Sequence, residues 1–324
     1  MRVMVVGGAG YVGSHMCKML AESGHEVVVF DNLSTGHYAA VKWGELFHSP
    51  LSDVAAIDGL FRKRNFDAVM HFAANSIVAD SVSDPLKYYQ NNVAETISLL
   101  ESMRRNDVRK FVFSSTAAIF GEPLQKLIDE SHPHQPINPY GRSKLMVEQI
   151  LADSVCAGHF DVVSLRYFNA AGADGSGLIG ESHNPETHLI PKILRKAAGE
   201  QIDVKVFGVD YPTEDGTCIR DYIHVNDLCS AHLKALEFLG YERGFHTFNL
   251  GNGRGYSVKQ IITAVEEVVG FKIPLPVCER RLGDPAVLVA SSARALQLLG
   301  WTPQRPDVRE IIESAWKWHQ DPAY

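Results

Sequence analysis

The segment that decides the fold is Val-Val-Gly-Gly-Ala-Gly-Tyr-Val-Gly at residues 5–13, where an apolar run passes into an amphipathic stretch. Gly7, Gly10 and Gly13 form a GxxGxxG pattern at the junction of an expected strand and an expected helix. The first glycine permits a tight turn, the second lets the backbone approach a pyrophosphate, and the third lets the helix pack closely on the sheet. The N–H groups that begin the helix then face the phosphates. The segment therefore predicts a dinucleotide site directly after the first strand.

The same alternation of strand and helix continues outward from this segment. The expected strands are nearly continuous runs of Val, Ile and Phe, as in a parallel sheet whose two faces are both covered by helices. This pattern predicts a Rossmann-type, doubly wound α/β fold. The strands are expected at residues 2–6, 26–30, 67–72, 110–114 and 161–166, and the helices at 12–23, 56–65, 85–105 and 139–152.

In the second half of the chain the regular alternation of strand and helix gives way to loops rich in Gly and Pro. We expect residues 1–168 to form an NAD-binding domain and residues 169–324 a smaller, loop-rich domain that closes over it and binds the substrate. Whether the chain crosses between the two domains is left open. Shorter helices are expected at 189–198, 257–268, 292–299 and 307–319.

Composition excludes several classes of protein. The 324 residues carry a formal net charge of −7 without a block of Lys and Arg, so nucleic acid is not an expected partner. Five scattered cysteines without a CxxC pair argue against a disulfide framework, and fourteen histidines without a recognisable spacing imply no metal. No apolar run approaches the roughly 20 residues of a membrane span. We expect a soluble, cytoplasmic protein.

Asp31 is the second element of the predicted dinucleotide site. It ends the second expected strand, 18 residues after Gly13, where a carboxylate accepts hydrogen bonds from the adenosine ribose. The alternative is a turn residue, because Asn32 follows it. In the context of the glycines we prefer the cofactor role. A carboxylate there repels a 2′-phosphate, so NAD is favoured over NADP.

A second motif, Tyr140-x-x-x-Lys144, follows Asn138 and Pro139. Asn138 is a suitable N-cap and Pro139 a suitable first helical residue, so the tyrosine and the lysine are expected one turn apart on one helical face. The alternative is a partly buried tyrosine beside a solvated lysine, since YxxxK is common by chance. Thr116, after an expected strand, offers a hydroxyl that can fix a substrate oxygen near Tyr140.

The expected chemistry of this pair is proton transfer. A phenol acting as a base at pH 7 needs its pKa lowered by about 3 units, or roughly 4 kcal/mol. One positive charge about 5 Å away supplies on the order of 3 kcal/mol at an effective dielectric near 20. Lys144 together with the charge of NAD⁺ is therefore expected nearly to cover the shift.

Over essentially the whole chain, these features resemble the extended short-chain dehydrogenase/reductase family, and especially its members that epimerise carbon 4 of UDP-hexoses. The most diagnostic stretches lie in the second half, Asp-Tyr-Pro-Thr-Glu-Asp-Gly-Thr at residues 210–217 and Arg-Asp-Tyr-Ile-His-Val at 220–225. The other matching stretches are residues 6–15, 71–74, 88–93, 138–141, 143–148 and 165–169.

The resemblance implies a homodimer formed through helices 85–105 and 139–152, and a reaction through a transient 4-keto sugar. It implies that Tyr140 is the base, with Lys144 as its electrostatic partner and Thr116 as the hydroxyl. The implied NAD-binding residues are Gly7, Gly10, Tyr11, Val12, Gly13, Asp31, Asn32, Leu51, Phe72, Asn91, Ser114, Tyr140, Lys144 and Tyr167. The implied UDP-sugar residues are Thr116, Asn169, His188, Leu189, Phe207, Arg220, Arg281, Asp284 and Leu288.

The chain also departs from the family pattern. Pro50 stands where an acidic residue usually approaches the adenine, and Ser76 replaces a lysine that often approaches the cofactor. The bulk of Leu288 is expected to disfavour N-acetylated sugars, while UDP-xylose/UDP-arabinose and UDP-N-acetylhexosamine remain alternative substrates. For Arg220 and Arg281 the alternative role is a surface ion pair.

The sequence also disfavours two other functions. A nucleotide-sugar dehydratase needs an acid/base carboxylate pair after the threonine, where this chain has Ala117 and Ala118. A non-catalytic NAD-binding protein is disfavoured because Thr116, Tyr140 and Lys144 are all present.

Overall fold

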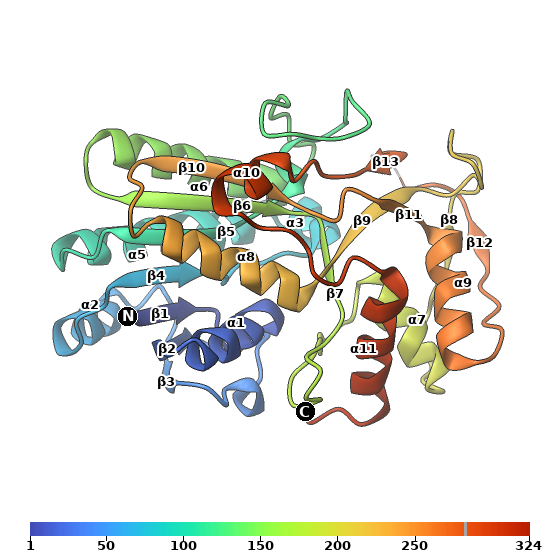
Figure 1. The fold of residues 1–324 in the computed structure, drawn as a ribbon, viewed down its shortest axis with the longest axis horizontal. Coiled ribbons are helices and arrows are strands. Elements are labelled where there is room, and N and C mark those ends of the chain that lie inside the picture. The colour runs from blue at the N-terminus through green and yellow to red at the C-terminus, as the bar shows by residue number, and fades with distance from the viewer. Residues whose placement is uncertain (282–283) are drawn as a thin grey trace.

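The structure is a computed structural model that describes residues 1–281 and 284–324. Figure 1 shows a large sheet with helices on both faces and, beside it, a smaller unit that contains the C-terminus. The fold class expected from the sequence, a doubly wound parallel α/β fold, is confirmed.

Seven parallel strands form the large sheet, in the order β10-β6-β5-β4-β1-β2-β3. The strand order reverses at β1, because β2 and β3 lie on one side of it and β4, β5 and β6 on the other. In such sheets ligands bind beyond the carboxyl ends of the strands, at the reversal. The strands are β1 (Arg2–Val6), β2 (Glu26–Asp31), β3 (Glu45–His48), β4 (Ala68–His71), β5 (Lys110–Thr116), β6 (Asp161–Tyr167) and β10 (Phe245–Leu250).

Alternate residues of each strand contribute to two separate hydrophobic cores. In β1, Val3 and Val5 belong to one core and Met4 and Val6 to the other, because successive side chains of a strand point to opposite faces. Both faces are therefore apolar, which explains the continuous hydrophobic runs. The first face is covered by α1 (Tyr11–Glu22), α8 (Val225–Phe238) and α10 (Ala293–Leu299), and the second by α2 (Val54–Lys63), α5 (Glu95–Arg105) and α6 (Pro139–Cys156).

The smaller unit has its own sheets and its own core. Strand β9 pairs with β11, β13 and β7, and β8 pairs with β12. Its helices enclose a core that includes Ile190, Ile261 and Ile311. The elements are β7 (Asn169–Ala171), α7 (Leu189–Ala197), β8 (Val206–Phe207), β9 (Ile219–His224), β11 (Gly255–Ser257), α9 (Val258–Val269), β12 (Val277–Cys278), β13 (Val287–Leu288) and α11 (Val308–Gln320).

Several elements differ from those expected from the sequence. The single helix expected at 85–105 is instead α4 (Pro85–Tyr88), a π-helical turn at residues 89–94, and α5, with the short helix α3 (Val78–Ser83) before them. Strand β3, every strand from β7 to β13 and helix α8 are not among the elements expected from the sequence. β3 and β10 are edge strands with polar residues, and α8 follows β9 without a connecting loop, so no turn signal separates them. After the second unit has begun, α8 and β10 return the chain to the large sheet.

The glycine turn between β1 and α1 is sterically determined. Gly7 has a φ of +82°, and a Cβ there would lie 2.5 Å from the backbone nitrogen of Ala73. A Cβ on Gly13 would lie only 2.0 Å from the carbonyl oxygen of Gly7. Both positions thus require glycine, because neighbouring backbone already fills the space that a side chain would take.

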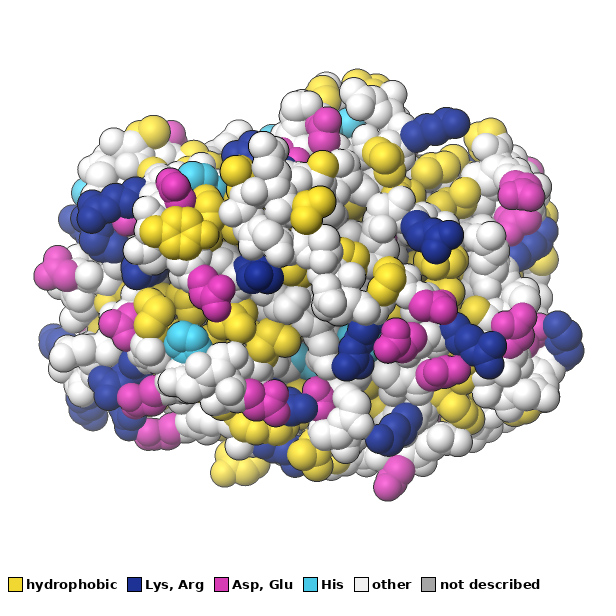
Figure 2. Space-filling model, in the orientation of Figure 1, with side chains coloured by type: hydrophobic (Ala, Val, Ile, Leu, Met, Phe, Trp, Pro, Cys, Tyr) yellow, Lys and Arg dark blue, Asp and Glu magenta, His cyan; other side chains and the backbone are white. Residues whose placement is uncertain are grey.

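Charges of both signs are interspersed over the face of the molecule seen in Figure 2. Within the two described ranges, no helix combines the length and the hydrophobicity that crossing a bilayer requires.

We predict that Gly13→Ala lowers the free energy of unfolding by about 1–3 kcal/mol or more, because the turn must move to admit the methyl group. Gly59→Ala is the matched control. Gly59 lies within α2 and a Cβ there meets nothing within 4 Å, so this change should raise the free energy of unfolding by about 0.5–1 kcal/mol. Urea unfolding measures both, and equal effects of the two substitutions would contradict the steric account.

Candidate active site

The start of α1 and the end of β2 form the first part of the site. Asp31 accepts hydrogen bonds from the backbone N–H groups of Ala9 (2.9 Å) and Leu33 (2.8 Å). Each carboxylate oxygen keeps a further lone pair for a ribose hydroxyl. No side chain in the described part of the chain caps α1 at Gly10, which leaves first-turn N–H groups for an anion. This arrangement fits the pyrophosphate and ribose of a dinucleotide.

The other residues expected to bind the cofactor lie in different settings. Phe72 follows the end of β4, and Asn91 lies within the π-helical turn, a distortion that is frequent at functional sites. Leu51 is instead buried in the hydrophobic core, and the side chain of Asn32 accepts a hydrogen bond within its own turn.

Tyr140 and Lys144 lie on the first turns of α6. The side chain of Asn138 caps this helix by accepting a hydrogen bond from the N–H of Gly141 (2.8 Å), as its position before Pro139 predicts. The Lys144 ammonium is buried and donates to the carbonyl oxygen of Ser114 in β5 (2.9 Å). β5 ends at Thr116, whose hydroxyl lies near enough to the Tyr140 phenol to lower its pKa against the effect of burial. The three residues expected to act together are therefore brought together.

The charge state of the pair differs from the one expected. Burial lowers the pKa of Lys144 to about 7, against the opposing effect of the Glu148 carboxylate. Burial also raises the pKa of Tyr140, and the Thr116 hydroxyl only partly opposes it. The lysine's contribution to lowering the pKa of the phenol is therefore smaller than the full unit charge used in the expectation, because desolvation disfavours an ammonium.

A buried ionic network beneath the pair was not anticipated from the sequence. Glu148 forms an ion pair with Arg166 of β6 (2.6 Å) and accepts hydrogen bonds from the hydroxyls of Ser115 (2.6 Å) and Ser164 (2.8 Å). Burial would raise the pKa of Glu148, but Arg166 and the hydroxyls hold it below its usual value. The only sequence signal for this network is that Glu148 follows Lys144 by one helical turn. The network keeps a negative charge below the lysine.

Ser114 and Tyr167 lie side by side at the carboxyl ends of β5 and β6, with their hydroxyl oxygens 2.6 Å apart. Burial raises the pKa of Tyr167, so it remains a neutral hydroxyl. Tyr167 is therefore suited to hydrogen bonding and not to proton abstraction.

Apart from Thr116 of β5, the residues expected to bind the sugar nucleotide come from the smaller unit. Arg220 of β9 forms an ion pair with Asp284 (2.8 Å), and its guanidinium also donates to the carbonyl oxygens of Ile219 and Pro285. The guanidinium of Arg281 lies over the Phe207 ring, 4.0 Å from its centre. Arg220 thus forms an ion pair, but a largely buried one and not the surface ion pair of the alternative.

Leu288 of β13 brings the smaller unit into contact with the large sheet close to Thr116. It packs against the cluster of Ala117, Ile119, Phe120 and Ile128, directly after Thr116. Asn169 begins β7, and His188 and Leu189 lie at the start of α7.

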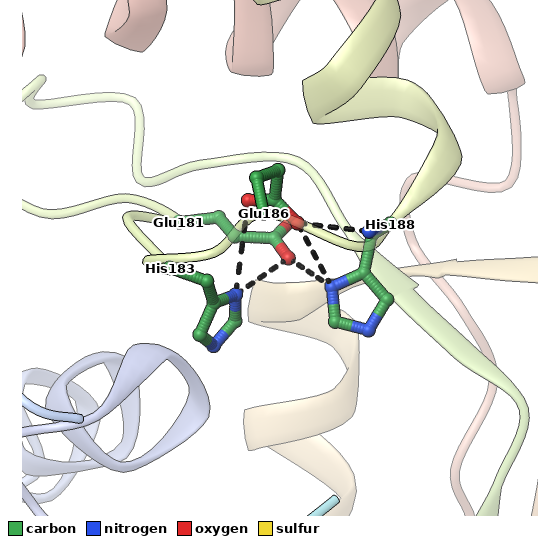
Figure 3. Close-up of side chains that lie close together, drawn as sticks. All are labelled: Glu181, His183, Glu186 and His188. Atoms are coloured by element: carbon green, nitrogen blue, oxygen red, sulfur yellow. Dashed lines mark hydrogen bonds and ion pairs between the residues drawn. The ribbon is translucent and has the colours of Figure 1, made fainter. Parts of the chain in front are cut away.

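His188 belongs to a cluster that the sequence analysis did not anticipate. Glu181, His183, Glu186 and His188 point toward one another in the segment before α7 (Figure 3), and one ligating atom from each lies within 4.8 Å of the others. Burial disfavours protonation of His188, but Glu181 and Glu186 raise its pKa to about 10. The spacing of these residues matches no familiar metal motif, so only the folded loop reveals them.

Comparisons with known proteins agree with this geometry. Residues 3–251 match the model of the NAD dependent epimerase/dehydratase family. The chain is 49% identical over 321 residues to a UDP-glucose 4-epimerase of Halalkalibacterium halodurans, covering 99% of this chain and 96% of that protein.

Two solved structures are similar throughout. One is a UDP-glucose 4-epimerase from Brucella ovis in complex with NAD, with a TM-score of 0.95, 47% identity and 97% of each chain covered. The other is a UDP-glucose-4-epimerase from Stenotrophomonas maltophila with bound NAD and formylated UDP-arabinopyranose. It has a TM-score of 0.95 and 41% identity, covering 99% of this chain and 98% of that chain.

We predict that Lys144→Met stabilises the protein near neutral pH. The pKa of Lys144 is lowered from 10.5 to about 7 on folding, so between these pH values the unfolded chain binds more protons and stability rises with pH. Removing the ammonium should abolish this rise and add on the order of a few kcal/mol at pH 7, at about 1.4 kcal/mol per pKa unit. Urea unfolding at pH 7 and pH 9 measures the effect.

The control is Lys63→Met, at an exposed position in the last turn of α2, which should leave the pH slope unchanged. A Lys144→Met protein that keeps the wild-type slope would show that the lysine is not the buried titrating group.

Proposed function

Because the chain belongs to the NAD dependent epimerase/dehydratase family, we propose that it inverts carbon 4 of a UDP-hexose, interconverting UDP-glucose and UDP-galactose through a transient 4-keto sugar. The observation that carries the proposal is the convergence of Thr116, Tyr140 and Lys144 at the carboxyl end of β5. It occurs in a chain 49% identical to a UDP-glucose 4-epimerase over 99% of its length.

The residues of the large sheet hold the cofactor. When bound, NAD⁺ would supply a reversible hydride acceptor and a positive charge. The start of α1 binds the pyrophosphate through backbone N–H groups, and Asp31 binds the adenosine ribose. Lys144 holds the nicotinamide ribose. Two observations support these roles. No side chain among the described residues caps the N-terminus of helix α1, and Asp31 keeps spare lone pairs.

Tyr140 takes the proton from the hydroxyl on carbon 4 and later returns it. Thr116 hydrogen-bonds the same oxygen and keeps it close to the phenol. Burial opposes ionisation of Tyr140 and half-neutralises Lys144 near pH 7, so the lysine alone does not create the phenolate. The additional positive charge of the oxidised cofactor, worth on the order of 3 kcal/mol at about 5 Å, would lower the pKa of the phenol by about 2 units and so add to the effect of the lysine. The base is thus active when an oxidised cofactor is present.

The smaller unit anchors the nucleotide and leaves the sugar free to turn. Arg281, stacked on Phe207, presents its guanidinium to the diphosphate, and planar forks suit such anions. Arg220 uses three of its five N–H donors within the protein, so it contributes with the remaining two and orients Asp284. Asn169 and the start of α7, with His188 and Leu189, complete the anchor. A firmly held diphosphate keeps the keto sugar in the site while its ring rotates.

Dehydration of a nucleotide sugar is a less well supported reaction for this site than epimerisation. It needs a carboxylate pair after the threonine, whereas Ala117 and Ala118 form an apolar turn there, fixed by the N–H of Ala118 donating to Thr116. A pentose substrate has one supporting observation, the formylated UDP-arabinopyranose in the similar Stenotrophomonas maltophila structure.

The assembly and location are part of the proposal. Exposed apolar side chains on the neighbouring helices α3, α4, α5 and α6 support a homodimer, which would bury them; they are Val82, Leu86, Ile97 and Met146. Light scattering should then give twice the 35.8 kDa of one chain. All five cysteines lie in the described residues as free thiols, which supports the reducing cytoplasm.

We predict that the purified protein equilibrates UDP-glucose with UDP-galactose faster than it acts on UDP-N-acetylglucosamine. Leu288 packs beside the turn after Thr116, and we expect its side chain to take the room that an acetamido group needs. Leu288→Ala, which removes three carbon groups, should raise the N-acetyl to plain-hexose ratio of kcat/KM by at least about 10-fold, the lower end of the effect of one methylene in a pocket. Separation of the epimers after incubation measures this ratio, and an unchanged ratio excludes Leu288 as the size filter.

We predict that Tyr140→Phe lowers kcat by about 10²–10⁴-fold while NAD stays bound, because the ring remains and only the proton-transferring oxygen is lost. Tyr241→Phe, at an exposed position far along the chain, is the matched control and should keep full activity. Turnover gives the first result and cofactor absorbance the second. Undiminished epimerisation by Tyr140→Phe would refute the assignment of the base.

A further inference from the structure

The segment before α7 concentrates four side chains that can ligate a metal ion. Glu181, His183, Glu186 and His188 all come from eight consecutive residues, and Figure 3 shows their side chains converging on one point. Both imidazoles present Nδ1 to the carboxylates. The cluster therefore offers two nitrogen and two oxygen donors.

The spacing of the donors is close to that of a tetrahedral site. Four donors about 2.0–2.1 Å from a zinc ion lie about 3.3–3.4 Å apart. The His183 Nδ1 lies 3.1 Å from a Glu181 oxygen and 3.8 Å from a Glu186 oxygen. The His188 Nδ1 lies 3.5 Å from Glu186 and 2.5 Å from Glu181. These separations involve both oxygens of Glu186, so one of the two has to move toward the shared centre, and the 2.5 Å separation has to open by about 0.8 Å.

Charge and burial favour an occupant of charge +2. The side chains of Glu181 and Glu186 are 4% and 1% exposed, so two carboxylates are buried close together. Two negative charges in this setting need two positive charges beside them. A divalent ion supplies both at one point. Protonation of His183 and His188 balances the same charge, so a pair of histidine–carboxylate ion pairs is the competing account.

We propose that Glu181, His183, Glu186 and His188 bind one divalent transition-metal ion of the zinc class. Mixed imidazole and carboxylate donors suit Zn²⁺, Co²⁺ or Ni²⁺, whereas Mg²⁺ and Ca²⁺ prefer oxygen donors alone. The proposed metal site shares His188 with the proposed UDP-sugar anchor, but no step of the proposed epimerisation needs the ion.

The position of the cluster gives the ion a structural role. The ring of His183 lies edge-on to Tyr11, the first residue of α1, at 6.3 Å. The Tyr11 hydroxyl donates to the carbonyl oxygen of Gly172 (2.6 Å), in the segment that leads to the cluster. At the other end of the cluster, His188 directly precedes the first residue of α7. An ion held here fixes the segment that joins the helix of the glycine turn to the smaller unit.

Cobalt titration of the full-length protein, purified with its cofactor, tests the site. The exposed thiol of Cys156 is first removed by Cys156→Ser so that it does not compete for the metal. We expect one Co²⁺ per chain with the intense visible absorption of four-coordinate cobalt. His183→Gln should weaken binding at least about 10-fold, since even the residues that support metal ligands have effects of 10- to 100-fold. His159→Gln, at an exposed position outside the cluster, should bind as the parent does.

Thermal unfolding provides the second readout. Zn²⁺ should raise the Tm of the parent and of His159→Gln, but not that of His183→Gln. Circular dichroism shows whether each variant is folded, and His188→Asn replaces His183→Gln if the latter is not. The absence of saturable Co²⁺ binding, or equal binding by the parent and a folded cluster variant, would overturn the proposal in favour of simple ion pairs.

Discussion

The desolvated ammonium of Lys144 is the constraint on which the arrangement of the site depends. It lies beneath the carboxyl edge of the large sheet, hydrogen-bonded to the Ser114 carbonyl. Burial disfavours its charge, and the Glu148 carboxylate one turn further along α6 favours it. Arg166 and the hydroxyls of β5 and β6 in turn keep Glu148 ionised. The lysine next to the Tyr140 phenol therefore has a pKa of about 7 and is not permanently charged.

The parallel sheet explains why so many functional groups meet at this point. Its strands all end at one edge, so the glycine turn after β1, Asp31 at the end of β2 and Thr116 at the end of β5 converge although they are far apart in sequence. The smaller unit adds β13, whose Leu288 packs next to the turn after Thr116. One rigid edge therefore holds the proposed cofactor and base, while the second unit brings the groups proposed to hold the substrate.

The sequence predicts those parts of the molecule that depend on local patterns. The glycine spacing, the apolar strands and the Asn138 cap all act within a few residues, and the structure has them where they were expected. The charge state of Lys144 and the pairing of Glu148 with Arg166 depend on contacts between separate strands and helices, which spacing does not reveal. The cluster around Glu181 depends on the path of an irregular loop, and β10 on an edge position that tolerates polar residues.

The most direct test of the central claim is a titration of the Tyr140 phenol in the oxidised and the reduced holoenzyme. The phenolate is followed by ultraviolet difference absorbance, with Tyr140→Phe subtracted. Because the protein's own groups raise the pKa of Tyr140, the account predicts a pKa about 2 units lower with NAD⁺ than with NADH, the effect of one positive charge about 5 Å away. The same pKa in both states would contradict it, and would mean that the protein alone sets the base.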